Sequence, residues 1–150
     1  MDTDVPGDCL PGTLSDAECL RLMASVPVGR IVYTQRAMPA VEPVNFALEQ
    51  GHIVIGTHPG SKLAAAIGHA VVAFEADELD FATHTGWSVT IVGTAQEVTD
   101  PAEIARLEDI GLITWASGER KHFVRIKPGV ITGRRLRGAG FPQEQPKPVC

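Results

Sequence analysis

Cysteine and histidine are too sparse and too scattered to build a cross-linked or metal-stabilised protein. The 150 residues contain three cysteines, Cys9, Cys19 and Cys150, which cannot all pair within one chain and form no Cys-x-x-Cys motif. The five histidines show no metal-ligand spacing. We therefore expect neither a disulfide framework nor a bound metal.

Long apolar runs and a surplus of positive charge are also missing. No stretch approaches the roughly 18 apolar residues that a bilayer-spanning helix needs, and the acidic N-terminus does not resemble a signal peptide. The 18 acidic and 13 basic residues give a formal charge of -5, which argues against general nucleic-acid binding. The sequence therefore predicts a cytoplasmic protein without nucleic-acid or membrane partners.

Motifs of nucleophilic enzymes are absent as well. The sequence has no Gly-x-Ser-x-Gly motif, no Cys–His pair that can be placed, and no paired carboxylates at a readable spacing.

The chain is 44% apolar and 21% charged, the composition of an ordinary globular domain. We expect one domain over residues 13–137, a flexible N-terminus over residues 1–12, and a disordered tail over residues 138–150.

Three short helices are predicted from their start and stop signals. Ser15 and Glu18 form a capping box at the start of the first helix. The run Asp100–Ile110 begins with an Asp cap followed by proline, which is a strong helix start. A third helix is predicted over Ser61–Ile67, because a glycine follows it directly.

The remaining apolar runs predict β-strands separated by turn residues, among them the hairpin turn Gln50–Gly51. Since strands and helices do not alternate regularly, an antiparallel barrel of six or seven strands is favoured, with the helices covering its openings. A bend is predicted at Gly93. The predicted strands are Val28–Thr34, Val41–Leu48, His52–Thr57, Ala70–Ala76 (a buried strand), Trp87–Val98, His122–Lys127 and Val130–Arg134, with Pro128–Gly129 joining the last two.

The most informative segment is the passage from Gly56 to Lys62, where a strand ends, a Pro-Gly turn follows and a helix begins. A helix N-terminus presents free N–H groups and partial positive charge, so a lysine there is unfavourable unless an anion binds. Thr57, Ser61 and Lys62 therefore predict a phosphate site. The alternative is that Ser61 is an ordinary helix cap and Lys62 a solvated charge.

Two other segments are compatible with a flat ligand. Pro43 lies inside a predicted strand and cannot donate to a β-ladder, so it must lie at an edge, a bulge or a site. A ring packed on the backbone of Val44–Phe46 is one explanation, and a plain edge strand is the other. Trp87 and Ser88 begin another strand and could supply a stacking face and a hydroxyl, although a tryptophan there is more often core or interface.

Taken in order, these segments resemble the pyridoxamine 5'-phosphate oxidase-like, FMN-binding split-barrel family. The resemblance covers about Leu14 to Arg135 and rests on the order and spacing of its pieces, since each piece alone is weak. The matching pieces are Val28–Ile31, Pro43–Phe46, Gly60–Leu63, Gly86–Val89, Trp115–Gly118 and Thr132–Arg135.

The resemblance implies a mainly β fold, a six-stranded antiparallel split β-barrel that forms a homodimer with FMN at the subunit interface. It implies an oxidoreductase that transfers hydride to or from a small organic substrate. The short actinobacterial relatives that the chain resembles leave two alternatives, an F420-dependent reductase and a non-enzymatic flavin- or haem-binding protein. No catalytic residue is implied. The implied cofactor-binding residues are Pro43, Val44, Asn45, Phe46, Thr57, Ser61, Lys62, Trp87, Ser88 and Trp115.

Two departures from the family pattern qualify this expectation. Gly56 stands where the family often has an arginine, which leaves three alternatives: phosphate affinity is lower, Arg30 or Arg134 compensates, or the chain is a cofactor-free relative. The segment Gly133–Gly138 lacks the histidine of the substrate-binding signature, which argues against oxidation of vitamin B6 itself. Residues 120–137 carry seven basic residues and no acidic one, which suits either an anionic ligand or a solvated strand face.

Overall fold

The computed structural model describes residues 12–58, 63–64, 68–112 and 122–137. Three predicted site residues, Ser61, Lys62 and Trp115, lie outside this part of the chain, as do residues 1–11 and 138–150. Of the predicted third helix, Leu63 and Ala64 are described and are helical. What the sequence predicts for the residues outside the described part of the chain therefore remains a prediction.

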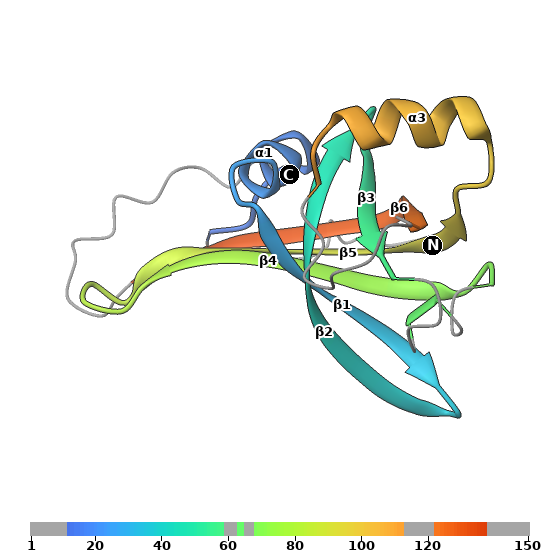
Figure 1. Ribbon diagram of the computed structural model, residues 1–150. Helices are drawn as coiled ribbons and strands as arrows, with labels where there is room; N and C mark the ends of the chain where they lie inside the picture. The colour runs from blue at the N-terminus through green and yellow to red at the C-terminus, as the bar shows by residue number, and fades with distance from the viewer. Residues whose placement is uncertain (1–11, 59–62, 65–67, 113–121, 138–150) are drawn as a thin grey trace, which may run out of the picture.

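Six antiparallel strands close into a barrel in the spatial order β1-β2-β3-β6-β5-β4 (Figure 1). This arrangement confirms the predicted mainly β, six-stranded split-barrel fold. The strands are β1 (Val28–Gln35), β2 (Met38–Glu49), β3 (His52–Thr57), β4 (Val71–Asp80), β5 (Thr85–Glu97) and β6 (His122–Leu136).

The turn between β2 and β3 has the conformation that its sequence predicts. Gln50 and Gly51 both adopt positive φ angles, 52° and 76°. Two consecutive positive φ angles give the tight two-residue turn whose twist matches that of antiparallel strands. The hairpin that they close pairs Glu49 with His52.

The interpretation of Pro128–Gly129 as a turn between two strands was wrong. β6 runs through these residues as one strand of 15 residues. The register with β5 shifts here, so that Val92 pairs with Val130 whereas Gly93 pairs with Pro128. This bulge accommodates a proline that has no N–H for the ladder, and it lies at the glycine where a bend was predicted.

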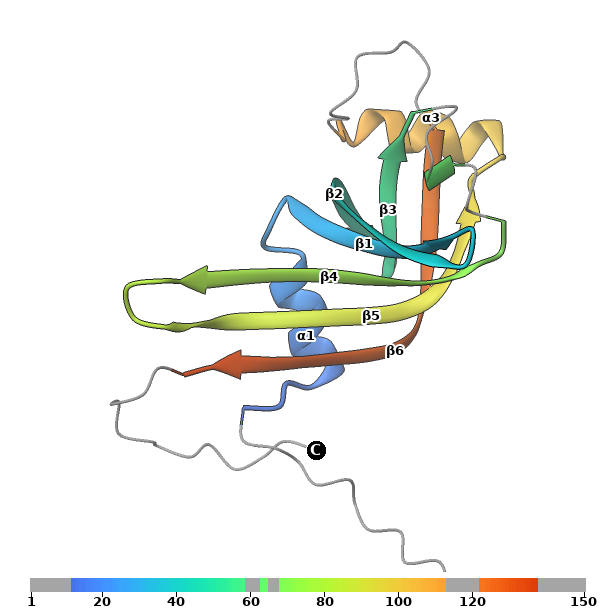
Figure 2. The same ribbon diagram turned by 90° about the horizontal axis from the view of Figure 1, so that it is seen from below.

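The first helix, α1 (Asp16–Met23), begins at the predicted cap. Ser15 Oγ accepts a hydrogen bond from the Glu18 amide at 3.3 Å. The helix crosses one face of the sheet beside β5 and β6 (Figure 2). A Cβ atom at Gly133 of β6 would lie 2.5 Å from the Sγ atom of the buried Cys19, so this glycine permits the close approach of the helix.

The second described helix, α3 (Pro101–Asp109), covers an apolar cluster on the outside of β3 and β6. Asp100 caps the helix by accepting a hydrogen bond from the Ala102 amide at 3.2 Å, as predicted. This cluster is separate from the core inside the barrel. Its buried members are Val54, Val98, Leu107, Leu112 and Phe123.

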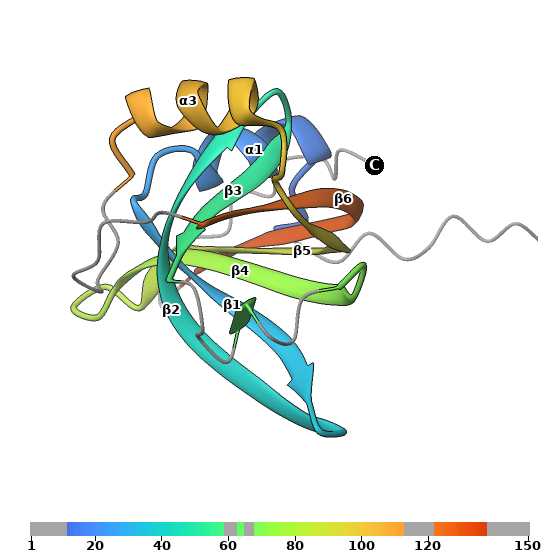
Figure 3. The same cartoon turned by 45° about the vertical axis from the view of Figure 1, so that its right-hand side comes forward.

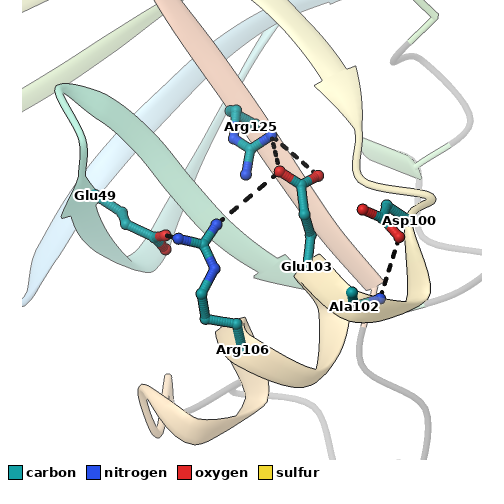
Figure 4. A network of polar contacts seen from close by, with 6 residues as sticks. All are labelled: Glu49, Asp100, Ala102, Glu103, Arg106 and Arg125. Carbon is teal, nitrogen blue, oxygen red and sulfur yellow. Dashed lines mark hydrogen bonds and ion pairs between the residues drawn. The ribbon is translucent and has the colours of Figure 1, made fainter.

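Four charged side chains add polar contacts between α3 and the strands beneath it (Figure 4). Arg125 of β6 contacts both carboxylate oxygens of Glu103, at 3.2 and 3.3 Å. Arg106 of the same helix forms an ion pair with Glu49 at the end of β2. Partly exposed ion pairs contribute at most about 1 kcal/mol each, so burial of the apolar cluster is the larger stabilising contribution.

Neither of these helices in the described part of the chain is long and apolar enough to cross a membrane.

Replacement of Leu107 by alanine tests the contribution of this cluster. The leucine side chain is 0% exposed, so Leu107→Ala should lower the free energy of unfolding by about 2–4 kcal/mol through lost burial and a residual cavity. Urea unfolding followed by circular dichroism measures this difference. The control Glu108→Ala changes the exposed neighbour and should alter stability by less than about 0.5 kcal/mol. Equal effects of the two substitutions would contradict the packing.

Candidate functional site

The alternation of side chains along each strand divides the predicted site residues between two faces of the sheet. Val44, Phe46 and Trp87 belong to the apolar core, with 9%, 5% and 5% of their surface exposed. Pro43 and Asn45 alternate with the buried residues of β2 and therefore lie on its outer face. A ligand on that outer face would not meet the side chains of Val44 and Phe46, and the Phe46 amide already donates a hydrogen bond to the Pro27 carbonyl at 3.2 Å.

Ser88 and Thr57 occupy different environments. Ser88 of β5 is half-buried on the outer face, directly opposite Asp77 of β4 and Arg134 of β6. Thr57 ends β3 with 6% of its surface exposed, and its hydroxyl donates to the His58 carbonyl at 3.3 Å. Thr57 is thus a buried hydroxyl at the point where the chain leaves the barrel for the predicted phosphate turn.

The first part of β2 lies at an edge of the sheet. Residues 38–45 pair with β1, and β2 pairs with β3 only from Phe46 to Glu49. Pro43 lies opposite Arg30 in the singly paired stretch, so of the three positions that its missing N–H allowed, an edge, a bulge or a site, the structure shows an edge. The β1–β2 hairpin extends away from α3 (Figure 3). One side of the β2 main chain therefore has no strand beside it in the described part of the protein.

An apolar row crosses the outer face of five strands. Cross-strand partners share a face of the sheet, so the strand register places these side chains side by side. Three of its valines are well exposed, Val41 at 59%, Val92 at 38% and Val130 at 59%. We call this the valine row, and it consists of Val41, Val32, Ala73, Val92 and Val130.

A polar row runs beside the valine row, two residues further along each strand. It contains Pro43 at the β2 edge and an ion-pair cluster at the contact between β1 and β4. We call it the polar row, and it consists of Pro43, Arg30, Glu75, Thr90 and Thr132. The predicted site residues of the outer face therefore lie in or next to a row that carries charge.

The cluster joins one guanidinium to two carboxylates. Arg30 Nη1 lies 3.5 Å from Glu75 Oε2 and 3.1 Å from Asp77 Oδ2. Glu75 Oε1 is buried and has no hydrogen-bond partner among the described residues. Arg30 is therefore engaged with two carboxylates, which weakens the suggestion that it replaces the arginine missing at Gly56.

The pKa of the Glu75 carboxyl is raised from 4.5 to about 7, chiefly by burial. A hydrogen bond with Asp77 and the charge of Asp77 contribute to this rise, whereas Arg30 opposes it. Burial dominates because an ionised carboxylate with one unpartnered buried oxygen has lost much of its hydration. At neutral pH the cluster is therefore near the midpoint between a neutral state and a state with one negative charge.

This cluster was not predicted, because Ala70–Ala76 was interpreted as a buried strand. β4 is buried on one face only, and Ala73, Glu75 and Asp77 form its other, half-exposed face. Two acidic residues at positions i and i+2 within an apolar run were the available signal. Their partner Arg30 lies 45 residues away in the sequence from Glu75, so the cluster itself was not visible.

A second pair that the sequence did not predict lies on the inner side of the β1–β2 hairpin. The Tyr33 hydroxyl donates a hydrogen bond to Glu42 Oε1 at 2.7 Å. Burial, together with the hydrogen bond to Glu42 and its charge, raises the pKa of Tyr33 to about 12. Tyr33 therefore remains a neutral donor at neutral pH.

In the described ranges no group of three or more His, Cys, Asp or Glu residues could hold a metal ion.

The shifted pKa of Glu75 predicts how stability depends on pH. Because the pKa is about 7 in the folded protein and 4.5 unperturbed, the contribution of Glu75 to stability is present below about pH 4.5 and lost as pH rises through about 7. Glu75→Gln should therefore gain about 1–2 kcal/mol over the wild type between pH 4.5 and pH 8, after a discount for partial exposure.

Urea unfolding at several pH values measures this difference. The exposed neighbour Glu78 supplies the control, because Glu78→Gln removes a carboxyl from the same strand without touching the cluster. A stability difference between wild type and Glu75→Gln that does not vary with pH would contradict the assignment.

Comparison with known proteins identifies the family. The model of the pyridoxamine 5'-phosphate oxidase family matches residues 15–135. An uncharacterized protein of Mycobacterium tuberculosis, Rv0080, is 40% identical over 124 residues, which are 79% of this chain and 81% of that protein.

Two solved structures share both sequence and fold with the chain. A structure described as the FAD binding protein from Mycobacterium smegmatis is 37% identical, covers 84% of this chain and 98% of its own, and gives a TM-score of 0.72. A structure from Corynebacterium glutamicum is 33% identical, covers 85% and 94%, and gives a TM-score of 0.73. The match over nearly all of the barrel, together with the split-barrel topology, shows that this chain belongs to the pyridoxamine 5'-phosphate oxidase family.

Proposed function

We propose that the protein binds a flavin nucleotide on the outer face of the barrel and acts as a flavin-dependent oxidoreductase. The observation that carries this proposal is the singly paired edge of β2, where the predicted residues Pro43 and Asn45 lie on the outer face of a stretch that has a partner strand on one side only. A planar ring can pack beside this part of β2, because no neighbouring strand occupies one side of the strand. Membership of the family and the 37% identity to an FAD binding protein support the same conclusion.

The residues of the chain would have separate tasks. Thr57, together with Ser61 and Lys62, would hold the phosphate by hydroxyl and ammonium donors. The main chain of Val44–Phe46 would orient the ring, and the Ser88 hydroxyl would complete the polar surroundings. A bound flavin supplies the hydride chemistry, so the protein itself needs only to bind, orient and exclude water.

FMN is the cofactor that we propose, and FAD is the second candidate because of the relative from Mycobacterium smegmatis. Both molecules contain the same ring and first phosphate, so the same residues would serve either one. The deazaflavin F420 stays an alternative. The substrate would be a small conjugated organic molecule other than vitamin B6, since Gly133–Gly138 lacks the substrate-binding histidine of the family signature.

We further propose that the protein is a homodimer and that the valine row lies in its interface. α3 covers the outside of β3 and β6 with an apolar cluster, whereas the outside of β1, β4 and β5 carries exposed valines and no covering element in the described chain. A continuous apolar row on a sheet surface is the kind of feature that monomeric proteins avoid and interfaces bury. A second copy of the chain is the partner that the family resemblance implies.

Cofactor loading tests the first proposal. Purified protein should absorb near the flavin bands, at about 450 nm, and mass spectrometry of the released cofactor should identify FMN or FAD. Lys62→Ala should weaken FMN binding by about 1.5–3 kcal/mol, roughly tenfold to a hundredfold, if the ammonium contacts the phosphate. The control Lys127→Ala removes an exposed lysine of β6.

Titration of the cofactor-free protein with FMN, followed by flavin fluorescence, gives the dissociation constants. Equal constants for Lys62→Ala and Lys127→Ala would remove Lys62 from the site. A colourless protein that binds neither FMN, FAD nor F420 would overturn the flavin proposal as a whole.

Charge placed in the valine row tests the dimer. Val92→Glu would bury a carboxylate in an apolar interface, so it should convert the dimer to a monomer at micromolar concentration. The control Ile110→Glu places the same charge on an exposed residue after α3, away from the row. Sedimentation velocity measures the molar mass. A dimer that survives Val92→Glu would place the interface elsewhere.

A further inference from the structure

The ion-pair cluster of Arg30, Glu75 and Asp77 is the feature of the outer face that the proposed function leaves unexplained. Both carboxylates contact the same nitrogen of one guanidinium, at 3.5 and 3.1 Å. One guanidinium carries a single positive charge and cannot neutralise two carboxylates, and Glu75 Oε1 is buried without a hydrogen-bond partner in the described protein. The doubly ionised state of this pair is therefore costly, and one bound proton relieves it.

The neighbouring elements offer Glu75 little further compensation. Thr90 of β5 lies opposite Glu75 and Pro43 of β2 lies beyond Arg30, and neither side chain carries a charge. Among the described residues, the charged groups that act on Glu75 are Arg30 on β1 and Asp77 on its own strand. Arg134 on β6 is separated from Asp77 by Ser88.

We propose that Glu75, Asp77 and Arg30 form a proton-controlled charge switch that sets the affinity of the outer face for an anionic flavin nucleotide. With one proton shared by Glu75 and Asp77, the cluster has no net charge. Without that proton it has one net negative charge, which repels the phosphate-bearing ligand. This inference rests on the proposed flavin site, because the cluster is flanked by its predicted residues Pro43 and Ser88.

The direction of the effect follows from the pKa of Glu75, which burial and Asp77 raise to about 7. Below this pH the cluster is neutral and binding is strongest. As pH rises through about 7 the proton leaves, and the affinity for FMN should fall about threefold to tenfold, as expected from one added charge near a partly screened site.

The proton site can be tested without any cofactor. In cofactor-free protein labelled with 13C at the glutamate carboxyl, the resonance missing from Glu75→Gln identifies Glu75. Its titration midpoint should lie near 7 in the wild type, fall in Asp77→Asn and rise in Arg30→Ala, because these residues shift it in opposite directions. A midpoint below about 5.5 in the wild type, or shifts of the same sign in the two variants, would overturn the proposal.

The charge effect is tested by the dissociation constants of FMN for wild type and Glu75→Gln between pH 5.5 and pH 8.5. The relevant quantity is the wild-type dissociation constant divided by that of Glu75→Gln, because ionisation of the FMN phosphate affects both constants. This ratio should be near one at low pH and rise about threefold to tenfold at high pH. The control Glu108→Gln removes an exposed carboxyl on α3 and should give a ratio that is independent of pH.

The outcomes separate the two proposals. Measurable FMN binding with a constant ratio between wild type and Glu75→Gln would overturn the switch and leave the flavin site standing. Absence of FMN binding to either protein at every pH would overturn the flavin site, and with it the electrostatic consequence. The carboxyl titration then still decides whether Glu75 and Asp77 share a proton.

Discussion

The short contact between β1 and β4 is the constraint on which the barrel depends. Three residue pairs join these strands, Arg30 with Glu75, Ile31 with Phe74 and Val32 with Ala73. The middle pair points inward, where Phe74 makes an edge-on contact with Phe46 at a centroid distance of 4.8 Å. The other two pairs, Arg30 with Glu75 and Val32 with Ala73, point to the opposite face. The same three pairs therefore close the core and place charged and apolar side chains on the outer surface.

This arrangement couples stability to surface chemistry. Ile31 and Phe74 are completely buried, and their burial favours closure of the barrel. The Arg30–Glu75 pair on the other side of the same rungs opposes closure in part, because Glu75 loses hydration without gaining a full set of hydrogen bonds. A carboxylate whose pKa is shifted by burial and by charged partners is a candidate functional group.

Local sequence signals predicted the elements of this fold well. The caps Ser15 and Asp100 and the Gln50–Gly51 turn act over a few residues, and all three are confirmed. The continuous strand through Pro128 was not predictable in the same way. Whether a proline ends a strand or lies in a bulge depends on the partner strand, and here the compensating shift is at Gly93 on β5.

In the candidate site, too, local features could be predicted from the sequence, whereas features that depend on partner strands could not. The order of the motifs predicted the residues of the outer face, Pro43, Asn45 and Ser88, but the sequence could not show that they share a face with a charge cluster. That juxtaposition depends on the register of four strands. Strand alternation was the usable part of the signal, since the period of two by itself separates Pro43 and Asn45 from Val44 and Phe46.

The tight packing of α1 against Gly133 has a practical consequence for thiol chemistry. Cys19 is completely buried, and burial, followed by the nearby Asp16 and Glu18, raises the pKa of its thiol. The raised pKa keeps the sulfur protonated, and burial keeps it out of reach of peroxide and alkylating reagents. A spectroscopic label introduced through a new surface cysteine would therefore leave Cys19 unmodified in the native state, and modification of Cys19 would report the opening of the helix from the sheet.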